Sequence, residues 1–240
     1  MAHRHMASKK PALKNAKRLE KYDLLCVAHP DDETIFFSGL LQSERKRPWT
    51  VVCMTNGNAD GDGKRRRRQF EAACKRQGVK DAQWWGFEDI YEKRLPVDEI
   101  SARLLALPTP ERVFTHGIIG EYGHPHHQDV SYAVHQAFAD HPKVYGAAYN
   151  AAPEIGIALN AKEFAIKGEI LTDIYGSETT RFMNLLPATA FEGFLQLDAV
   201  EIEAVYDFFV REKPLRQRDL KAYRWLAAFL KTRRDQKRPF

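Results

Sequence analysis

A buried strand that ends in a polar turn is predicted by the stretch Asp23-Leu-Leu-Cys-Val-Ala-His-Pro-Asp-Asp-Glu33. Short apolar runs bounded by turn residues are typical of central parallel strands. A second such run, Trp49-Thr-Val-Val-Cys-Met54, ends in Thr-Asn-Gly. Between the two runs, apolar residues recur at helical spacing from Glu33 to Glu44, with Asp31 or Asp32 at the N-cap position. The order of strand, helix and strand predicts a βαβ unit.

The same alternation continues to about residue 150. We predict further helices at 64–77, 97–107 and 127–138, and further strands at 82–85, 112–116 and 144–149. Alternating strands and helices predict an α/β, Rossmann-like fold with a mostly parallel, doubly wound sheet and helices on both faces. Beyond residue 150 the pattern weakens and becomes more helical, with helices expected at 161–175, 198–211 and 215–231.

The length of 240 residues suits one α/β domain with extensions at its ends. We expect a basic N-terminal extension over 1–21, a single catalytic domain over 22–211, and a basic amphipathic helix and tail over 212–240. The first eight residues resemble sequence introduced by cloning. In the last helix, one face carries apolar residues, which is typical of a helix docked on its own domain: Leu220, Tyr223, Leu226 and Leu230.

The net charge of +5 is unevenly distributed. Residues 1–21 hold seven Lys/Arg against one acid, and residues 211–240 hold eleven against three, which leaves −9 for residues 22–210. A negative central region predicts that the domain is not a general nucleic-acid surface. Solvated tails are the simplest interpretation of the basic ends, and peripheral contact with an anionic membrane is the alternative.

Two features of the sequence concern its location. No apolar run approaches the ~20 residues that span a bilayer, and no apolar core of a secretory signal follows the basic residues at the N-terminus. Cys26 and Cys53 lie in apolar runs and Cys74 lies in a helical segment, an arrangement typical of inert thiols in a reducing compartment. We therefore expect a cytoplasmic protein.

Metal-binding side chains concentrate in two segments, Ala28-His-Pro-Asp-Asp-Glu33 after the first strand and Glu121-Tyr-Gly-His-Pro-His-His127 after the fourth. In a doubly wound sheet, the carboxyl ends of these strands face one crevice. Two imidazoles and a carboxylate form a common donor set for a catalytic divalent metal, and a second carboxylate can accept a proton from water. Helix capping is the alternative for the Asp-Asp pair alone, but capping needs no histidines there.

AHPDDE followed by GEYGHPHH resembles the PIG-L/LmbE-like family of zinc-dependent N-acetylglucosaminyl deacetylases, over about residues 22–150. The resemblance implies His29, Asp32 and His127 as metal ligands and Asp31 as the general base. It implies zinc as the metal, with another divalent ion such as Fe²⁺ as the alternative. Glu33 also matches the first motif, where we expect it to support the site from behind.

The second motif implies further roles. His124 matches the histidine that protonates the leaving amine or stabilises the tetrahedral intermediate, and Tyr122 matches the tyrosine that polarises the amide carbonyl. Arg68, in Arg68-Gln-Phe-Glu71, and Asp89 resemble substrate-binding residues. The chain departs from the family pattern at His126, where Asp or Asn is more usual, and loss of that carboxylate is expected to lower the pKa of His124.

The resemblance implies a hydrolase that removes the acetyl group from an N-acetylated amino sugar, which can be phosphorylated, nucleotide-linked or lipid-linked. Trp84 and Trp85 are interpreted as core residues, with stacking on a sugar ring as the alternative. A same-fold amidase or deacylase of a thiol-sugar or long-chain conjugate is a second hypothesis for the function. A non-catalytic polyanion-binding module is a third, and it leaves both motifs unexplained.

Overall fold

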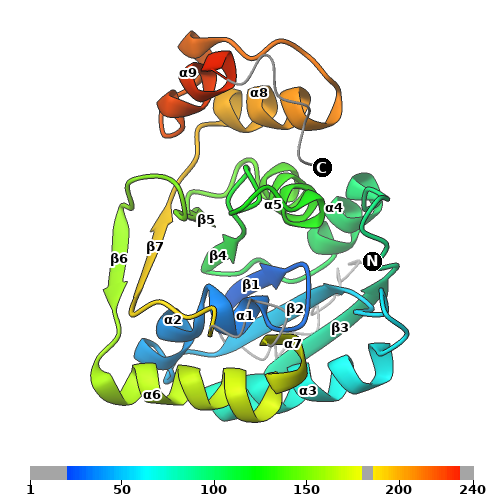
Figure 1. The fold of residues 1–240 in the computed structure, drawn as a ribbon, viewed down its shortest axis with the longest axis vertical. Helices are drawn as coiled ribbons and strands as arrows, with labels where there is room; N and C mark the ends of the chain where they lie inside the picture. Colours follow the sequence, from blue (N-terminus) through cyan, green and yellow to red (C-terminus); the bar gives the residue numbers. More distant parts are fainter. Residues whose placement is uncertain (1–20, 180–185, 233–240) are drawn as a thin grey trace, which may run out of the picture.

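The computed structural model describes residues 21–179 and 186–232, and within them a seven-stranded sheet forms the centre (Figure 1). Its strand order is β3-β2-β1-β4-β5-β7-β6. The strands are β1 (Asp23–Val27), β2 (Trp49–Thr55), β3 (Asp81–Phe87), β4 (Arg112–Thr115), β5 (Val144–Ala147), β6 (Ile155–Ala158) and β7 (Phe191–Leu195). The first five strands pair in parallel, whereas β7 pairs antiparallel with both β5 and β6. The predicted mostly parallel α/β fold is confirmed.

Helices connect the strands. They are α1 (Asp32–Ile35), α2 (Ser38–Ser43), α3 (Gly63–Gln77), α4 (Val97–Leu105), α5 (Pro125–Ala137), α6 (Ala161–Glu169), α7 (Gly176–Thr179), α8 (Ala199–Val210) and α9 (Arg224–Thr232), with a π-helical turn at Ile170–Ile174 and a 3-10 turn at Gln217–Asp219. The single helix expected between β1 and β2 was wrong, because the chain breaks into α1 and α2. The backbone leaves the helical region at Phe37, whose buried ring stacks on Phe194 of β7 at 5.6 Å.

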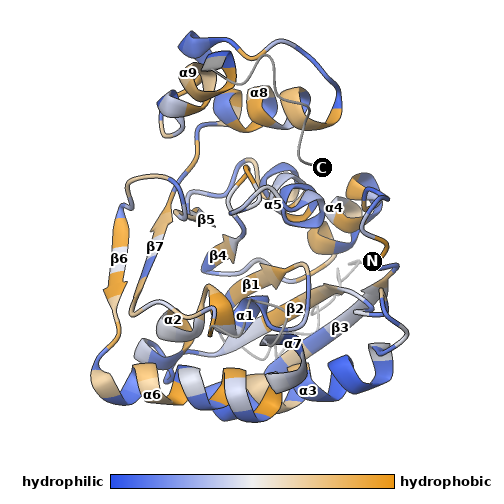
Figure 2. Ribbon diagram, viewed as in Figure 1, coloured by the Kyte–Doolittle hydropathy of each residue, from blue (hydrophilic) through white to orange (hydrophobic). Residues whose placement is uncertain are grey.

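Alternate residues of β1 face opposite sides of the sheet, and each side is covered by helices. Leu24 and Cys26 pack in one core with α4 and α5. Leu25 and Val27 pack in a second core with α2 and α3. Figure 2 shows α3 as hydrophilic over most of its length, since only its sheet-facing positions are buried. Helices therefore cover both faces of the sheet, as the doubly wound pattern predicted.

The last part of the chain packs onto α8. Leu220, Tyr223 and Leu226 are buried there together with Ile118 from the loop after β4, so the stretch docks on its own chain as expected. The helix begins later than predicted, at Arg224. The buried Glu201 carboxylate accepts hydrogen bonds from the backbone N–H groups of residues 221, 222 and 223, which holds these residues as a turn ahead of α9. Among the helices of the described segments, none combines the length and the apolar content needed to cross a membrane.

A charged cluster fastens the start of β1. Asp23 is fully buried and accepts hydrogen bonds from the guanidinium groups of Arg47 at 3.1 Å and Arg112 at 2.6 Å. Arg112 also pairs with Glu44, and Arg47 also pairs with Glu111. Burial alone would raise the pKa of Asp23, but the hydrogen bonds from the two arginines lower it. The cluster therefore stabilises the fold as long as Asp23 is ionised.

We expect Asp23→Asn to lower the free energy of unfolding at pH 7 by roughly 2–3 kcal/mol, less than a fully buried pair would lose because Arg47 is partly exposed. A depressed native pKa contributes stability above the unfolded pKa of about 3.9 and loses it as the pH falls through the native value. The difference in the free energy of unfolding between wild type and variant, measured by urea unfolding, should therefore become smaller below about pH 4. Asp140→Asn, on an exposed turn, is the control, and a pH-independent difference would contradict the prediction.

Candidate metal and catalytic site

The two motifs meet because β1 pairs directly with β4. The first motif leaves the carboxyl end of β1, and the second leaves the carboxyl end of β4 and enters α5. The N–H of Ala28 donates a hydrogen bond of 3.0 Å to Nε2 of His116, the residue that follows β4. This bond connects the two loops where they leave the sheet. The two motifs therefore lie close together, as expected.

Three buried side chains form the centre of the site. Nδ1 of His29 lies 3.2 Å from Nε2 of His127. The Asp32 carboxylate lies 3.4 Å from each of these nitrogens, through Oδ2 to His29 and through Oδ1 to His127. Donor atoms about 2.0–2.1 Å from a tetrahedral zinc ion lie about 3.3–3.4 Å from one another. The chemistry and the spacing of the predicted donor set therefore fit a divalent metal such as zinc.

A buried carboxylate orients one of these donors from behind. Oε2 of Glu121 lies 2.6 Å from Nδ1 of His127 and 3.1 Å from Nδ1 of His116, and Oε1 accepts a hydrogen bond from the N–H of Gly117. Burial alone would raise the pKa of Glu121, but His116 and His127 lower it to about 2. The ionised carboxylate accepts a hydrogen bond from the Nδ1–H of His127. The lone pair on Nε2 of His127 is then directed at the metal-binding position.

Asp31 stands beside the donor set without serving as a cap. It occupies the N-cap position of α1, yet its side chain makes no capping hydrogen bond, and its φ of 110° costs ~1–3 kcal/mol for a residue other than glycine. Its N–H donates to the buried Glu33 carboxylate, which also accepts from the Tyr175 hydroxyl. Burial and the charge of Asp32 raise the pKa of Asp31 to about 8, against the opposite effect of Arg66. Glu33 thus supports a turn that presents a carboxyl group free of helix capping.

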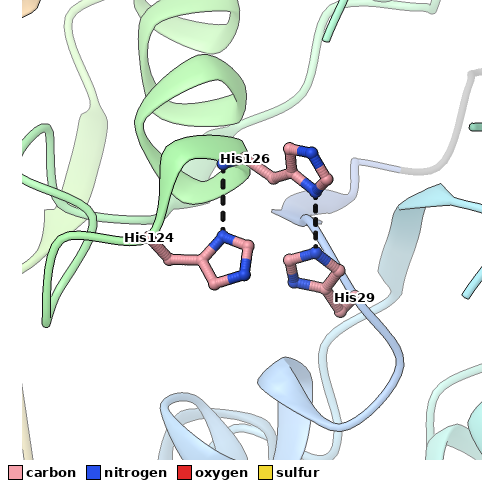
Figure 3. A group of neighbouring side chains, drawn as sticks. All are labelled: His29, His124 and His126. Carbon is pink, nitrogen blue, oxygen red and sulfur yellow. Dashed lines mark hydrogen bonds between the residues drawn. The ribbon is translucent and has the colours of Figure 1, made fainter. Parts of the chain in front are cut away.

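His124 caps α5, which the sequence analysis did not expect of a histidine. Its Nδ1 accepts a hydrogen bond of 3.2 Å from the N–H of His126, and its ring points toward His29 (Figure 3). Burial first, then His127 and His29, lower the pKa of His124. The shift has the expected direction, but burial is its main cause. A neutral His124 that accepts at Nδ1 carries its proton on Nε2.

Tyr122 lies at the rim of the site. Its side chain is 53% exposed, and its ring centre lies 5.6 Å from that of His127 and 6.0 Å from that of His124. Tyr91 is also partly exposed and packs edge-on against the His124 ring at 5.2 Å. Two aromatic side chains with free polar tips thus flank the one histidine that faces outward from the metal-binding position.

The structure does not bring Arg68 to the site. Arg68 lies on the exposed side of α3, whereas Arg66 is buried and donates a hydrogen bond of 2.8 Å from Nη2 to the Pro30 carbonyl. The same nitrogen lies 3.3 Å from Oδ2 of Asp31. Helical spacing could have identified this arginine, because position 66 is four residues before the buried Phe70 and the run of four arginines offers only one residue on that face.

Asp89 does reach the site, from the loop after β3. Its carboxylate is buried and lies 3.8 Å from Arg66, 3.5 Å from Nε2 of His29 and 3.5 Å from Nδ1 of His126. Burial would raise the pKa of Asp89, but the neighbouring imidazoles of His126 and His29 outweigh that effect and lower it. Its role in substrate binding stays a prediction.

His116 and Glu121 belong to the site although no role was predicted for either residue. The available signal was position alone, since His116 directly follows a predicted strand and Glu121 opens the second motif. Trp84 and Trp85 pack in the cores on opposite faces of the sheet, Trp84 against Phe70 and Trp85 under the guanidinium of Arg103. Their interpretation as core residues is therefore supported over sugar stacking.

Residues 24–138 match the PIG-L family, described as GlcNAc-PI de-N-acetylase. N-acetylglucosaminyl-phosphatidylinositol de-N-acetylase of Saccharomyces cerevisiae is 29% identical over 89 residues, which cover 33% of this chain and 29% of that protein. A probable N-acetyl-alpha-D-glucosaminyl L-malate deacetylase 2 of Bacillus cereus is 27% identical over 146 residues, which cover 52% of this chain and 64% of that protein. Across the curated relatives, the matched region spans between 26% and 64% of their length.

Solved structures share the fold at low identity. N,N'-diacetylchitobiose deacetylase from Pyrococcus horikoshii has a TM-score of 0.55 and 20% identity, with 72% of this chain and 82% of that chain covered. A deacetylase of teicoplanin biosynthesis has a TM-score of 0.59 and 17% identity, covering 74% and 99%. The 4-carboxy-2-hydroxymuconate hydratase from Pseudomonas putida KT2440 has a TM-score of 0.54 and 17% identity, covering 74% and 98%.

Residues 24–138 therefore carry the PIG-L family match, and the resemblance inferred from the two motifs is confirmed. The family description and the names of both relatives refer to deacetylases that act on N-acetylglucosamine-containing molecules. The hydratase shows that the fold also hosts a different reaction, so the activity of this chain must be argued from its own site.

We expect Glu121→Gln to weaken zinc binding by roughly 10–100-fold, because the amide can no longer hold the Nδ1 proton of His127 as a carboxylate does. Competition against a chromogenic chelator measures the affinity. Glu192→Gln is the matched control, since Glu192 is a buried carboxylate paired with Lys167 at a distance from the donor set. Equal losses in the two variants would contradict an orienting role for Glu121.

Proposed function

We propose that this chain is a metal-dependent N-deacetylase of an N-acetylated amino sugar, with zinc as the expected metal and Fe²⁺ as the alternative. One observation carries the proposal: Asp31, a carboxyl group not used for capping, stands next to three buried donors whose spacing suits a divalent metal, within a PIG-L domain. His29, Asp32 and His127 are assigned as the ligands. The buried and free cysteines favour a reducing, cytoplasmic setting as part of the same proposal.

When bound, such a metal lowers the pKa of a water molecule and polarises the acetamide oxygen. Asp31 is assigned as the base that takes the proton of the attacking water, because its carboxyl group adjoins the ligand Asp32 and accepts no helix-capping bond. Arg66, 3.3 Å away, holds the Asp31 carboxylate in place and favours its ionised form. The base is therefore positioned from two sides, by the turn that Glu33 supports and by Arg66.

His124 and Tyr122 are assigned to the opposite side of the reacting amide. His124 carries its proton on Nε2, and this N–H can donate to the developing oxyanion or to the leaving nitrogen. The Tyr122 hydroxyl is assigned to the same oxygen from the rim of the site. The proton taken from water passes to the leaving amine as the C–N bond breaks, so the products are acetate and the free amino sugar.

Substrate contacts are assigned to Arg66 and Asp89, in place of the Arg68 assignment. Both face the site, from α3 and from the loop after β3, and Tyr91 and Tyr122 offer aromatic surfaces to a sugar ring at the rim. The substrates in the names of the two relatives differ in the group attached to the sugar, which is phosphatidylinositol in one and malate in the other. The proposal therefore includes phosphorylated, nucleotide-linked and lipid-linked conjugates, with peripheral membrane contact for the last of these.

A same-fold amidase or deacylase that acts on a thiol-sugar or long-chain conjugate is the alternative function. It uses the same donor set and the same base, and the hydratase with this fold illustrates how far the chemistry can change. Acetate release from a panel of free, phosphorylated, nucleotide-linked and lipid-linked N-acetylglucosamines separates the two functions. No release from any member by zinc-loaded protein would favour the alternative.

We expect Asp31→Asn to bind zinc as wild type does but to release acetate at least about 100-fold more slowly, because the amide cannot accept the proton of water. Asn tolerates a positive φ better than most residues, so the turn should persist. The measurement pairs acetate release with zinc content on one preparation. Wild-type turnover in a zinc-replete variant would remove Asp31 from the mechanism.

We expect Arg66→Met to lower kcat/KM by about 100-fold or more, because it leaves the Asp31 and Asp89 carboxylates buried without their cation. Arg68→Met, two residues along the same helix, should stay within about twofold of wild type, since exposed charges contribute little. Steady-state kinetics on the best panel substrate compare the two. A larger loss from Arg68→Met would restore the original assignment.

A further inference from the structure

His126 contacts His29, a proposed metal ligand (Figure 3), and it also contacts the loop after β3. Its side chain is fully buried. Nε2 lies 3.0 Å from the carbonyl oxygen of Ile90 and 2.9 Å from that of Lys93. Both neighbours can only accept hydrogen bonds, so Nε2 must carry a proton, and in the neutral ring Nδ1 is then the acceptor.

The proton positions continue into His29. Nδ1 of His126 lies 3.0 Å from Nε2 of His29, so the His29 nitrogen is the donor of this bond. A neutral His29 with its proton on Nε2 has its lone pair on Nδ1. Nδ1 is the atom that faces Asp32 and His127. Two backbone carbonyls therefore determine, through His126, which nitrogen of His29 is free to bind a metal.

We propose that His126 is a positioning residue that holds His29 in the tautomer competent for metal binding. The inference rests on the proposed metal site. Asp89 is the other acceptor near Nε2 of His29, but at 3.5 Å it lies at the limit of hydrogen-bond distance and is shared with His126. The closer contact at 3.0 Å assigns the bond to His126.

The histidine performs a task that an acidic residue in its place does not. A carboxylate can accept the proton of His29, but it cannot donate to the carbonyls of Ile90 and Lys93. His126 does both, and so it fastens the loop that carries Asp89 and Tyr91 to the ligand His29. The departure from the family pattern at this position thus couples the metal ligand to the loop that carries the proposed substrate contacts.

A second metal is the rival explanation. His29, His124 and His126 can each offer a nitrogen within 4.8 Å of the others. For His29 to serve two metal ions, however, both of its ring nitrogens would have to lose their protons, whereas the 3.0 Å contact between Nε2 of His29 and Nδ1 of His126 needs a proton on one of the two nitrogens. The two explanations differ in metal stoichiometry and in the effect of substitutions at His126.

Two substitutions separate the two functions of the ring. The Oδ1 atom of Asn can take the place of Nδ1, and the amide nitrogen of Gln can take the place of Nε2. We expect His126→Asn to keep zinc affinity within about threefold of wild type, and His126→Gln, which keeps the carbonyl contacts but lacks the acceptor, to lose about 10–100-fold. The readout is chelator competition with Zn²⁺ alone. His135→Gln, on the same helix and bonded to Ser131, is the control and should match wild type.

The outcomes are distinct. Equal affinities of the Asn and Gln variants, whether high or low, overturn the positioning role of His126, and two zinc ions per wild-type chain overturn it in favour of a second site. A wild type that binds no zinc overturns the proposed metal site itself. Should a variant fail to fold, nitrogen-15 NMR of the wild-type histidine rings without metal decides, since His29 and His126 must both be protonated at Nε2. Protonation of either ring at Nδ1 instead overturns the proposal.

Discussion

The parallel pairing of β1 with β4 is the constraint on which the rest of the site depends. It sets Asp23 opposite Arg112 and Leu25 opposite Phe114, so that both strands release their loops at the same edge of the sheet. The bond from the Ala28 N–H to the His116 side chain joins the two residues that directly follow these strands. Because both strands are packed on both faces, a shift of either strand would disturb two close-packed cores and separate Asp23 from Arg112, so the loops that carry the histidines and carboxylates start from fixed positions.

Burying several charges at one edge is costly unless each finds a partner, and the partners differ. Asp32 faces imidazoles, Glu33 accepts hydrogen bonds from neutral donors, and Glu121 bridges two histidines. Asp31 contacts a single guanidinium, that of Arg66, and burial and the charge of Asp32 raise its pKa. The pKa of Glu33 is raised as well, but its carboxylate accepts hydrogen bonds from Thr34 and Tyr175, whereas Asp31 lies beside the proposed metal donors, where a raised pKa suits proton exchange.

The parallel core could be predicted because its signals are local. The β1 and β2 runs are apolar throughout, and the helices between strands carry regular apolar spacing, so periodicity placed them within a few residues. Strands β6 and β7 lack a long apolar run. Each is short and contains a glycine, and the two strands, which pair with each other, are separated by more than 30 residues of sequence. Arg68 was predicted to bind substrate, and Arg66 was not considered, because a motif match in a run of four arginines ignores which side of α3 is buried.

The sequence could predict which side chains lie close together, but it could not predict which ring nitrogens carry protons. The motifs indicate that His29 and His127 lie together, and they do not say which nitrogen of each ring is free. In our proposal, this is decided by the Glu121 carboxylate behind His127 and by the His126 imidazole behind His29. A carboxylate partner makes the ring it contacts a stronger donor to a metal than a neutral partner does. The two proposed ligands are therefore inequivalent, and the difference arises from one residue, His126, which contacts carbonyl groups of a loop more than 30 residues earlier in the sequence.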